Sequence, residues 1–135
     1  MKSRRLTLFT VFLIFFIWGI NLVALKWNLY HYFRWFDIPM HMLGGFWIAL
    51  FGLVTYYHSP LVTRKDRSTF FVVAFTLAVT MCIGLLWELF EFGVDHSIAL
   101  SDNDLADTLG DFVNDMIGAA IATLFFLWRG YNKII

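Results

Sequence analysis

Four long stretches of apolar residues alternate with short polar segments along the chain. They cover residues 6–25, 38–57, 70–92 and 108–128. Each has about 20 residues, and a helix of that length, rising about 1.5 Å per residue, spans the roughly 30 Å hydrocarbon core of a bilayer. The pattern therefore predicts an all-α, polytopic integral membrane protein. We expect its four transmembrane helices to form a compact bundle in a single domain, residues 1–135.

The first apolar stretch follows Lys2, Arg4 and Arg5, as the hydrophobic part of a signal peptide would. However, it is longer than the roughly 7–15 apolar residues of such a peptide. No small-x-small cleavage site closes it before Lys26. We therefore expect this segment to be retained as the first transmembrane helix.

Composition agrees with a membrane location. The chain is 60% hydrophobic and 15% charged, whereas about 25% of the residues in soluble domains are charged. The single cysteine, Cys82, excludes a disulfide framework and a cysteine-based zinc site. The sequence has no phosphate-binding glycine loop, serine nucleophile elbow or nucleic-acid-binding motif. Membrane lipids are therefore expected partners, and nucleic acid is not.

Basic residues are divided unevenly between the two sides that four spans define. The termini and the segment between the second and third spans hold eight of the ten, and the other side has only Lys26 and Arg34. Lys and Arg are enriched in cytoplasmic loops. We therefore expect both termini on the cytoplasmic side of a cell membrane.

Acidic residues and histidines gather on the opposite side, at the outer ends of three predicted helices. They recur at spacings of three and four residues, which place side chains on one face of a helix. Because the three outer ends lie at a similar depth, the three polar faces are expected to converge. The residues are Asp37 and His41 in the second span, Glu88 and Glu91 in the third, and Asp107, Asp111 and Asp115 in the fourth.

Such a cluster is costly inside a membrane, where one charged side chain at the bilayer centre costs about 2.5–3.5 kcal/mol on insertion scales. Few basic residues are nearby, so either some carboxylates are protonated or a cation is bound. Histidine and carboxylates without a thiolate suit Mg²⁺, Mn²⁺ or Ca²⁺, and the imidazole also suits Zn²⁺. We therefore predict that the seven residues of the three faces are candidate ligands of a divalent cation.

Several of these positions also have a purely structural interpretation, although Asp115 does not. Asp37 can cap the second span, since Asp is a favoured N-cap residue. Thr108 and Asp111 have the spacing of a capping box. Small residues allow helices to approach closely, and this is the expected role of Gly44, Gly45 and Gly118.

Three motifs resemble a known family. The segments DIPMHMLGGFWIAL, GLLWELFEFGVD and DTLGDFVNDMIGAAIAT are similar to the YjdF-like (DUF2238) small bacterial membrane proteins and, more distantly, to the VanZ-like family. The resemblance covers roughly residues 30–128 and names no reaction. It implies a shared polar site formed by Asp37, His41, Glu88, Glu91, Asp107, Asp111, Asn114, Asp115 and Gly118.

Our leading hypothesis is metal-dependent chemistry on, or recognition of, an envelope lipid or cell-wall precursor. In a hydrolase or transferase acting on a lipid-linked substrate, His41, Asp37 and Glu88 are the candidate catalytic residues. An ion or proton transporter and a noncatalytic membrane scaffold remain as alternatives, since intramembrane acids also form proton relays. A homo-oligomer is compatible with each of them.

Overall fold

A computed structural model describes residues 2–63, 65–98 and 105–134. Its four long helices are α1 (Lys2–Lys26), α3 (Asp37–His58), α4 (Thr69–Ile98) and α5 (Leu105–Trp128). Each contains a segment long and apolar enough to cross a membrane. The predicted membrane architecture of four helices is confirmed.

Three short helices complete the described chain. α2 (Leu29–Tyr32) and the 3₁₀ helix η1 (Arg34–Phe36) join α1 to α3, and α6 (Tyr131–Ile134) follows α5. The Tyr30 hydroxyl donates a hydrogen bond of 2.7 Å to Asn21 Oδ1. This bond fastens α2 to α1, so the connection folds back against the end of the bundle.

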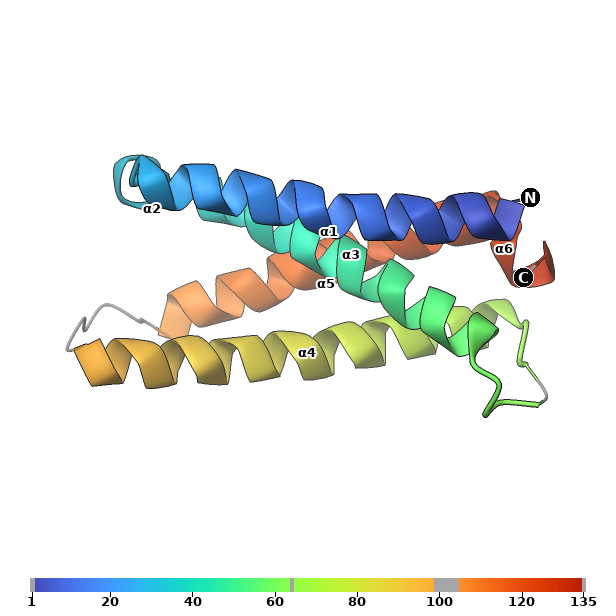
Figure 1. The fold of residues 1–135 in the computed structure, drawn as a ribbon. Coiled ribbons are helices and arrows are strands. Elements are labelled where there is room, and N and C mark those ends of the chain that lie inside the picture. The colour runs from blue at the N-terminus through green and yellow to red at the C-terminus, as the bar shows by residue number, and fades with distance from the viewer. Residues whose placement is uncertain (1, 64, 99–104, 135) are drawn as a thin grey trace.

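The long helices are arranged in layers (Figure 1). α3 and α5 cross in the middle, with α1 on one side of the pair and α4 on the other. Both termini lie at one end of the bundle with the segment that joins α3 to α4, and we call this the terminal end. α2, the last turns of α4 and the first turns of α5 lie at the other end, which we call the α2 end.

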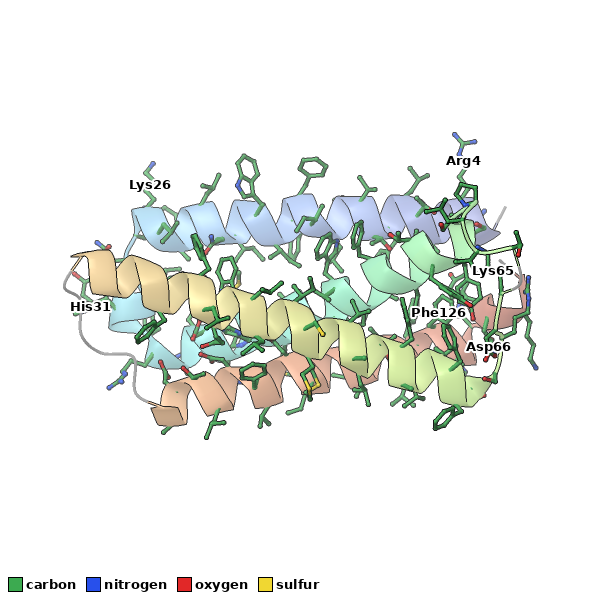
Figure 2. All side chains as sticks on the ribbon, turned by 90° about the horizontal axis from the view of Figure 1, so that it is seen from below. Arg4, Lys26, His31, Lys65, Asp66 and Phe126 are labelled. Carbon is green, nitrogen blue, oxygen red and sulfur yellow. The ribbon has the colours of Figure 1, made fainter. Side chains whose placement is uncertain are left out.

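The two ends carry different charged side chains. Figure 2 places Arg4, Lys65 and Asp66 at the terminal end, and Lys26 and His31 at the α2 end. The Ser68 amide donates a hydrogen bond of 2.8 Å to Asp66 Oδ1 and holds the pKa of this carboxyl below its usual value. The common position of both termini agrees with four spans, while their cytoplasmic location stays a prediction.

α3 and α5 approach most closely at two glycines. A Cβ on Gly45 would overlap the backbone of Asp115, and a Cβ on Gly118 would overlap the backbone carbonyl of Met42. Both positions therefore need glycine, as the sequence predicted. The same prediction was wrong for Gly44, because nothing lies within 4 Å of a Cβ built there.

The interior toward the terminal end is an apolar core. Leu50, Leu53, Val72 and Phe126 are fully buried, and the Tyr57 ring stacks on Phe126 with 5.7 Å between ring centroids. Large apolar side chains also cover the outside of the bundle. In a membrane protein these outward side chains face lipid, so burial between helices marks the residues that define the packing.

Candidate metal centre

The polar residues of α3 and α5 meet around His41. His41 Nε2 lies 3.6 Å from Asp37 Oδ1, one turn earlier on α3, and 3.7 Å from Asp111 Oδ1 on α5. The other ring nitrogen, Nδ1, lies 3.3 Å from Asp115 Oδ1. The imidazole therefore faces two carboxylates through one nitrogen and a third through the other.

The cluster lies mostly inside the bundle. The side chains of His41, Asp111 and Asp115 are 10%, 12% and 7% exposed, whereas that of Asp37 is 35% exposed. Asp37 is also the first residue of α3, at the α2 end. The cluster therefore opens toward the α2 end and is closed toward the middle of the bundle.

The separations around Nε2 are those of ion pairs between an imidazolium and two carboxylates, and they are also close to the spacing of ligands around one metal ion. A side-chain contact of 3.6 Å is too long for a hydrogen bond. Two ligands about 2.1 Å from a tetrahedral ion lie roughly 3.4 Å apart, close to the 3.6 and 3.7 Å seen here. Ligand atoms of Asp37, His41 and Asp111 all lie within 4.8 Å of one another. A small contraction would bring all three into the coordination shell of one ion.

Asp115 holds the opposite edge of the imidazole. Its ion-pair contact of 3.3 Å with His41 Nδ1 is just longer than the usual N–H···O hydrogen bond of about 2.7–3.2 Å. Histidines that bind metals usually donate their second N–H to a carboxylate or carbonyl, which fixes the tautomer and the ring orientation. The arrangement of His41 between Asp115 and the other two carboxylates follows this pattern.

Glu88 on α4 forms a third wall. One of its carboxylate oxygens, Oε1, is buried and has no hydrogen-bond partner among the described residues. The carboxylate is close enough to Thr108 of α5, and to His41 and Asp115, for electrostatic interaction. A buried acceptor oxygen without a hydrogen-bond partner among the described residues therefore lies beside the cluster.

The remaining predicted ligands are placed less centrally. Asp107 is exposed in the first turn of α5, yet it is close enough to Asp37 and Asp111 to repel both. The backbone of Glu91 belongs to α4, but its side chain lies outside the described residues.

The two capping interpretations are wrong. The residue before α3 at its N-cap is Phe36, so Asp37 is already within the first turn and does not cap the helix. Thr108 lies inside α5, which begins at Leu105, so Thr108 and Asp111 do not form a capping box. Both acids therefore lack the local structural role that the sequence suggested for them.

Two further residues of α4 lie beside the cluster around His41, and they were not predicted from the sequence. Asp115 Oδ2 lies 2.8 Å from the position that a Cβ on Gly84 would take, so the carboxylate fits because residue 84 has no side chain. Thr80, one turn further, is fully buried and its hydroxyl has no partner within the described part of the chain. Glu88, Gly84 and Thr80 are spaced four residues apart, so they share one face of α4, and this spacing could have identified Gly84 and Thr80 from the sequence.

Comparison with known proteins gives a family and a location. The sequence model of DUF2238, described as a predicted membrane protein, matches residues 1–132. Neither the curated proteins nor the solved structures gave a match. The matched region includes every residue of the cluster, and the family description names no reaction.

Proposed function

The chain belongs to the DUF2238 family of membrane proteins, and on that premise we propose that Asp37, His41 and Asp111 bind a divalent cation. The cation would serve chemistry on an envelope lipid or cell-wall precursor at the extracytoplasmic face. The observation that carries this proposal is the pair of distances from His41 Nε2 to two carboxylates, which are too long for hydrogen bonds and near the separation of metal ligands.

The ligand set favours particular ions. One imidazole nitrogen with carboxylate oxygens suits Mn²⁺ and Zn²⁺, whereas Ca²⁺ and Mg²⁺ prefer oxygen ligands alone. We therefore place Mn²⁺ and Zn²⁺ ahead of the other two candidates.

Charge also supports a bound cation. Asp37, Asp111 and Asp115 surround a single imidazole, while Lys26 and Arg34, the basic residues of the α2 end, are exposed. Several carboxylates sharing a partly buried site repel one another unless a proton or a cation intervenes. A divalent ion would offset two of the negative charges at once.

The geometry suggests a distinct role for each side chain. A bound divalent ion supplies Lewis-acid polarisation of a phosphoryl oxygen and activation of water. Both nitrogens of His41 face carboxylates, so we assign His41 to ion binding and Asp115 to its orientation. Glu88 has a buried oxygen without a partner among the described residues, and we assign it to accept a proton from water.

The transport alternative has less support within one chain. The polar residues continue from the cluster to Thr80 and to Thr76, whose hydroxyl lies 2.7 Å from that of Thr123. Beyond that pair the interior is filled by Leu53 and Phe126, both fully buried. A path for ions or protons through the protomer would have to pass this apolar layer.

Elemental analysis of the detergent-purified protein tests the proposal, together with thermal unfolding with and without a chelator. We expect near-stoichiometric Mn²⁺ or Zn²⁺ and a lower Tm after chelation, since a ligand at about 100 times its Kd stabilises by roughly 2.7 kcal/mol. The Asp111→Asn/Asp115→Asn variant should lose both effects. Asp66→Asn, which removes an exposed carboxylate at the terminal end, should keep them.

Two results together would sink the proposal. One is a purified protein without metal, and the other is a Tm that added Mn²⁺, Zn²⁺, Mg²⁺ or Ca²⁺ leaves unchanged. The carboxylates would then have to share protons instead.

A further inference from the structure

An apolar groove runs along the outer surface between α4 and α5. It has a volume of about 560 Å³, and its lining includes Met81 and Leu85 of α4 and Phe112, Met116 and Ala120 of α5. In a protein that spans a membrane, this groove is open to the hydrocarbon region. Its two methionines have flexible, polarizable side chains that adapt to irregular apolar ligands.

The groove adjoins the candidate metal centre. Phe112 and Met116 directly follow Asp111 and Asp115 in the sequence, so neighbouring residues of α5 line the groove and the cluster. Gly84 separates the two, since a Cβ built there would lie 2.8 Å from Asp115 Oδ2 and 3.6 Å from Phe112 Cε1. The apolar groove and the polar cluster are therefore two sides of one contact between α4 and α5.

We propose that the groove holds the hydrocarbon tail of a lipid phosphate whose phosphate reaches the metal centre. This inference rests on the proposed function and names the substrate class of the same site. The tail would lie against Met81, Met116 and Ala120, and the polar end of the lipid would point toward the α2 end, where the cluster opens.

The short distance between the groove and the cluster restricts which lipids can occupy both. Phe112, in the groove, is one residue from the proposed ligand Asp111, which corresponds to about 1.5 Å along the axis of α5. A group that touches the cluster must therefore follow the tail within a few atoms. This fits a phosphate joined to the tail directly or through a short linker, and not a sugar or peptide carried far from it.

Charge makes the binding of such a lipid depend on the metal. Without a cation the three carboxylates around His41 repel a phosphate, whereas a bound divalent ion would offset two of these charges and offer a phosphate oxygen a direct ligand position. By linkage, a lipid phosphate must raise the affinity for the metal by the same factor as the metal raises the affinity for the lipid. A dependence of lipid binding on metal therefore distinguishes a specifically bound lipid phosphate from the bulk lipid that fills any apolar groove.

The molecule contains a control for ordinary lipid. A second apolar groove of about 510 Å³ lies between α3 and α4, with Phe51, Phe75 and Ile83 in its lining. None of the residues that line it belongs to the cluster around His41. Lipid bound there should not respond to metal.

The experiment uses the full chain in phosphatidylcholine nanodiscs that contain phosphatidic acid with a photoreactive acyl chain. After irradiation, labelled positions are mapped by mass spectrometry with Mn²⁺ or with chelator. We expect Mn²⁺ to raise labelling around residues 112–120 about fivefold or more, within the usual range of coupling, and to leave labelling of the second groove unchanged. A photoreactive phosphatidylcholine should show no such response.

Two substitutions sharpen the test. Ala120→Phe, at an exposed position in the first groove, should abolish the metal-dependent labelling. Ile83 is 44% exposed and lines the second groove. Ile83→Phe, which would fill that groove, should leave the metal-dependent labelling of the first groove unchanged. Both variants should bind Mn²⁺ in plain phosphatidylcholine as the parent does, which confirms that they are folded.

The outcomes distinguish the two proposals. If Mn²⁺ binds but labelling of the first groove is the same with chelator, or matches that of phosphatidylcholine, the lipid phosphate inference is overturned and the metal centre stands. If Mn²⁺ does not bind at all, the proposed function fails and this inference with it.

Discussion

The pair formed by α3 and α5 has two different interiors on either side of its glycine crossing. Toward the terminal end, Leu50, Leu53 and Phe126 are fully buried in an apolar core. Toward the α2 end, His41 is enclosed by carboxylates from both helices. Both halves are formed by the same two helices, so the two interiors differ in their side chains.

Packing alone explains why the side chains of the apolar half are buried, but it does not explain the burial of the carboxylates in the polar half. Buried apolar side chains gain dispersion contacts with every neighbour. Buried carboxylates lose their hydration and repel each other, and a buried ionic group is weak evidence for stability. The comparison teaches that the terminal half is organised for folding and that the α2 half retains polar groups at a cost that a bound ligand would offset.

The largest expected effect is in the apolar half. Phe126→Ala should lower the free energy of unfolding by about 3–5 kcal/mol, because it removes a fully buried ring and leaves a cavity. Equilibrium unfolding in mixed micelles measures this loss. The matched control is Phe12→Ala, which removes an outward-facing ring that is 64% exposed and should cost far less. Equal losses for the two would mean that this half is not the packed core.

The next effect concerns the crossing that the two halves share. Gly118→Ala should cost about 2–3 kcal/mol, since its Cβ would overlap the Met42 carbonyl and push the helices apart. Because the displacement also moves Asp111 from His41, Mn²⁺ affinity should fall as well. Gly44→Ala, with open space around its Cβ, should leave Mn²⁺ affinity unchanged and raise the free energy of unfolding by about 0.5–1 kcal/mol, because alanine is the better helix former. If Gly118→Ala leaves the free energy of unfolding unchanged, α3 and α5 must lie further apart than the overlap with the Met42 carbonyl implies.

In the polar half, stability and function should move in opposite directions. Asp111→Asn should raise the free energy of unfolding of the metal-free protein by about 1 kcal/mol, because it removes one of several repelling buried charges. Mn²⁺ affinity should fall about 100-fold or more, since even residues behind the ligands change it 10–100-fold. Calorimetric titration and thermal unfolding give the two values. A drop in both would place Asp111 among the residues needed for folding.

The smallest effect lies at the boundary between the halves. Thr80→Val should raise the free energy of unfolding by about 1 kcal/mol, because it replaces a buried hydroxyl that has no partner among the described residues. Thr76→Val should lower it by a similar amount, since Thr76 bonds Thr123. Thermal unfolding of the two variants side by side checks the sign. If Thr80→Val is the destabilising one, its hydroxyl has a partner such as internal water.

Much of the architecture follows from the sequence because hydrophobic length and helical spacing are local properties. Runs of about 20 apolar residues predict the spans. Acids four residues apart predict that Asp111 and Asp115 share a face with each other, as Asp37 does with His41. The convergence of these faces required that the helix ends carrying them lie at one depth and that the polar faces turn toward the inside of the bundle.

Other features depend on how the helices cross, which spacing does not reveal. Gly44 and Gly45 are adjacent and chemically identical, yet only Gly45 meets α5. The division of the His41 nitrogens between Asp115 and the other two carboxylates depends on ring orientation. That Asp37 is the first residue of α3, and not its N-cap, depends on where η1 ends. Each of these is set by tertiary contact.

Pulsed electron paramagnetic resonance of Mn²⁺ bound to the purified protein tests the central claim most directly, because it detects nitrogen atoms bonded to the ion. We predict modulation from one histidine nitrogen in the parent protein and its loss in His41→Gln. His58 lies at the end of α3 remote from the cluster, so His58→Gln should retain the modulation. Bound Mn²⁺ without nitrogen modulation, or a signal that His41→Gln leaves unchanged, would contradict the assignment of the metal centre to His41.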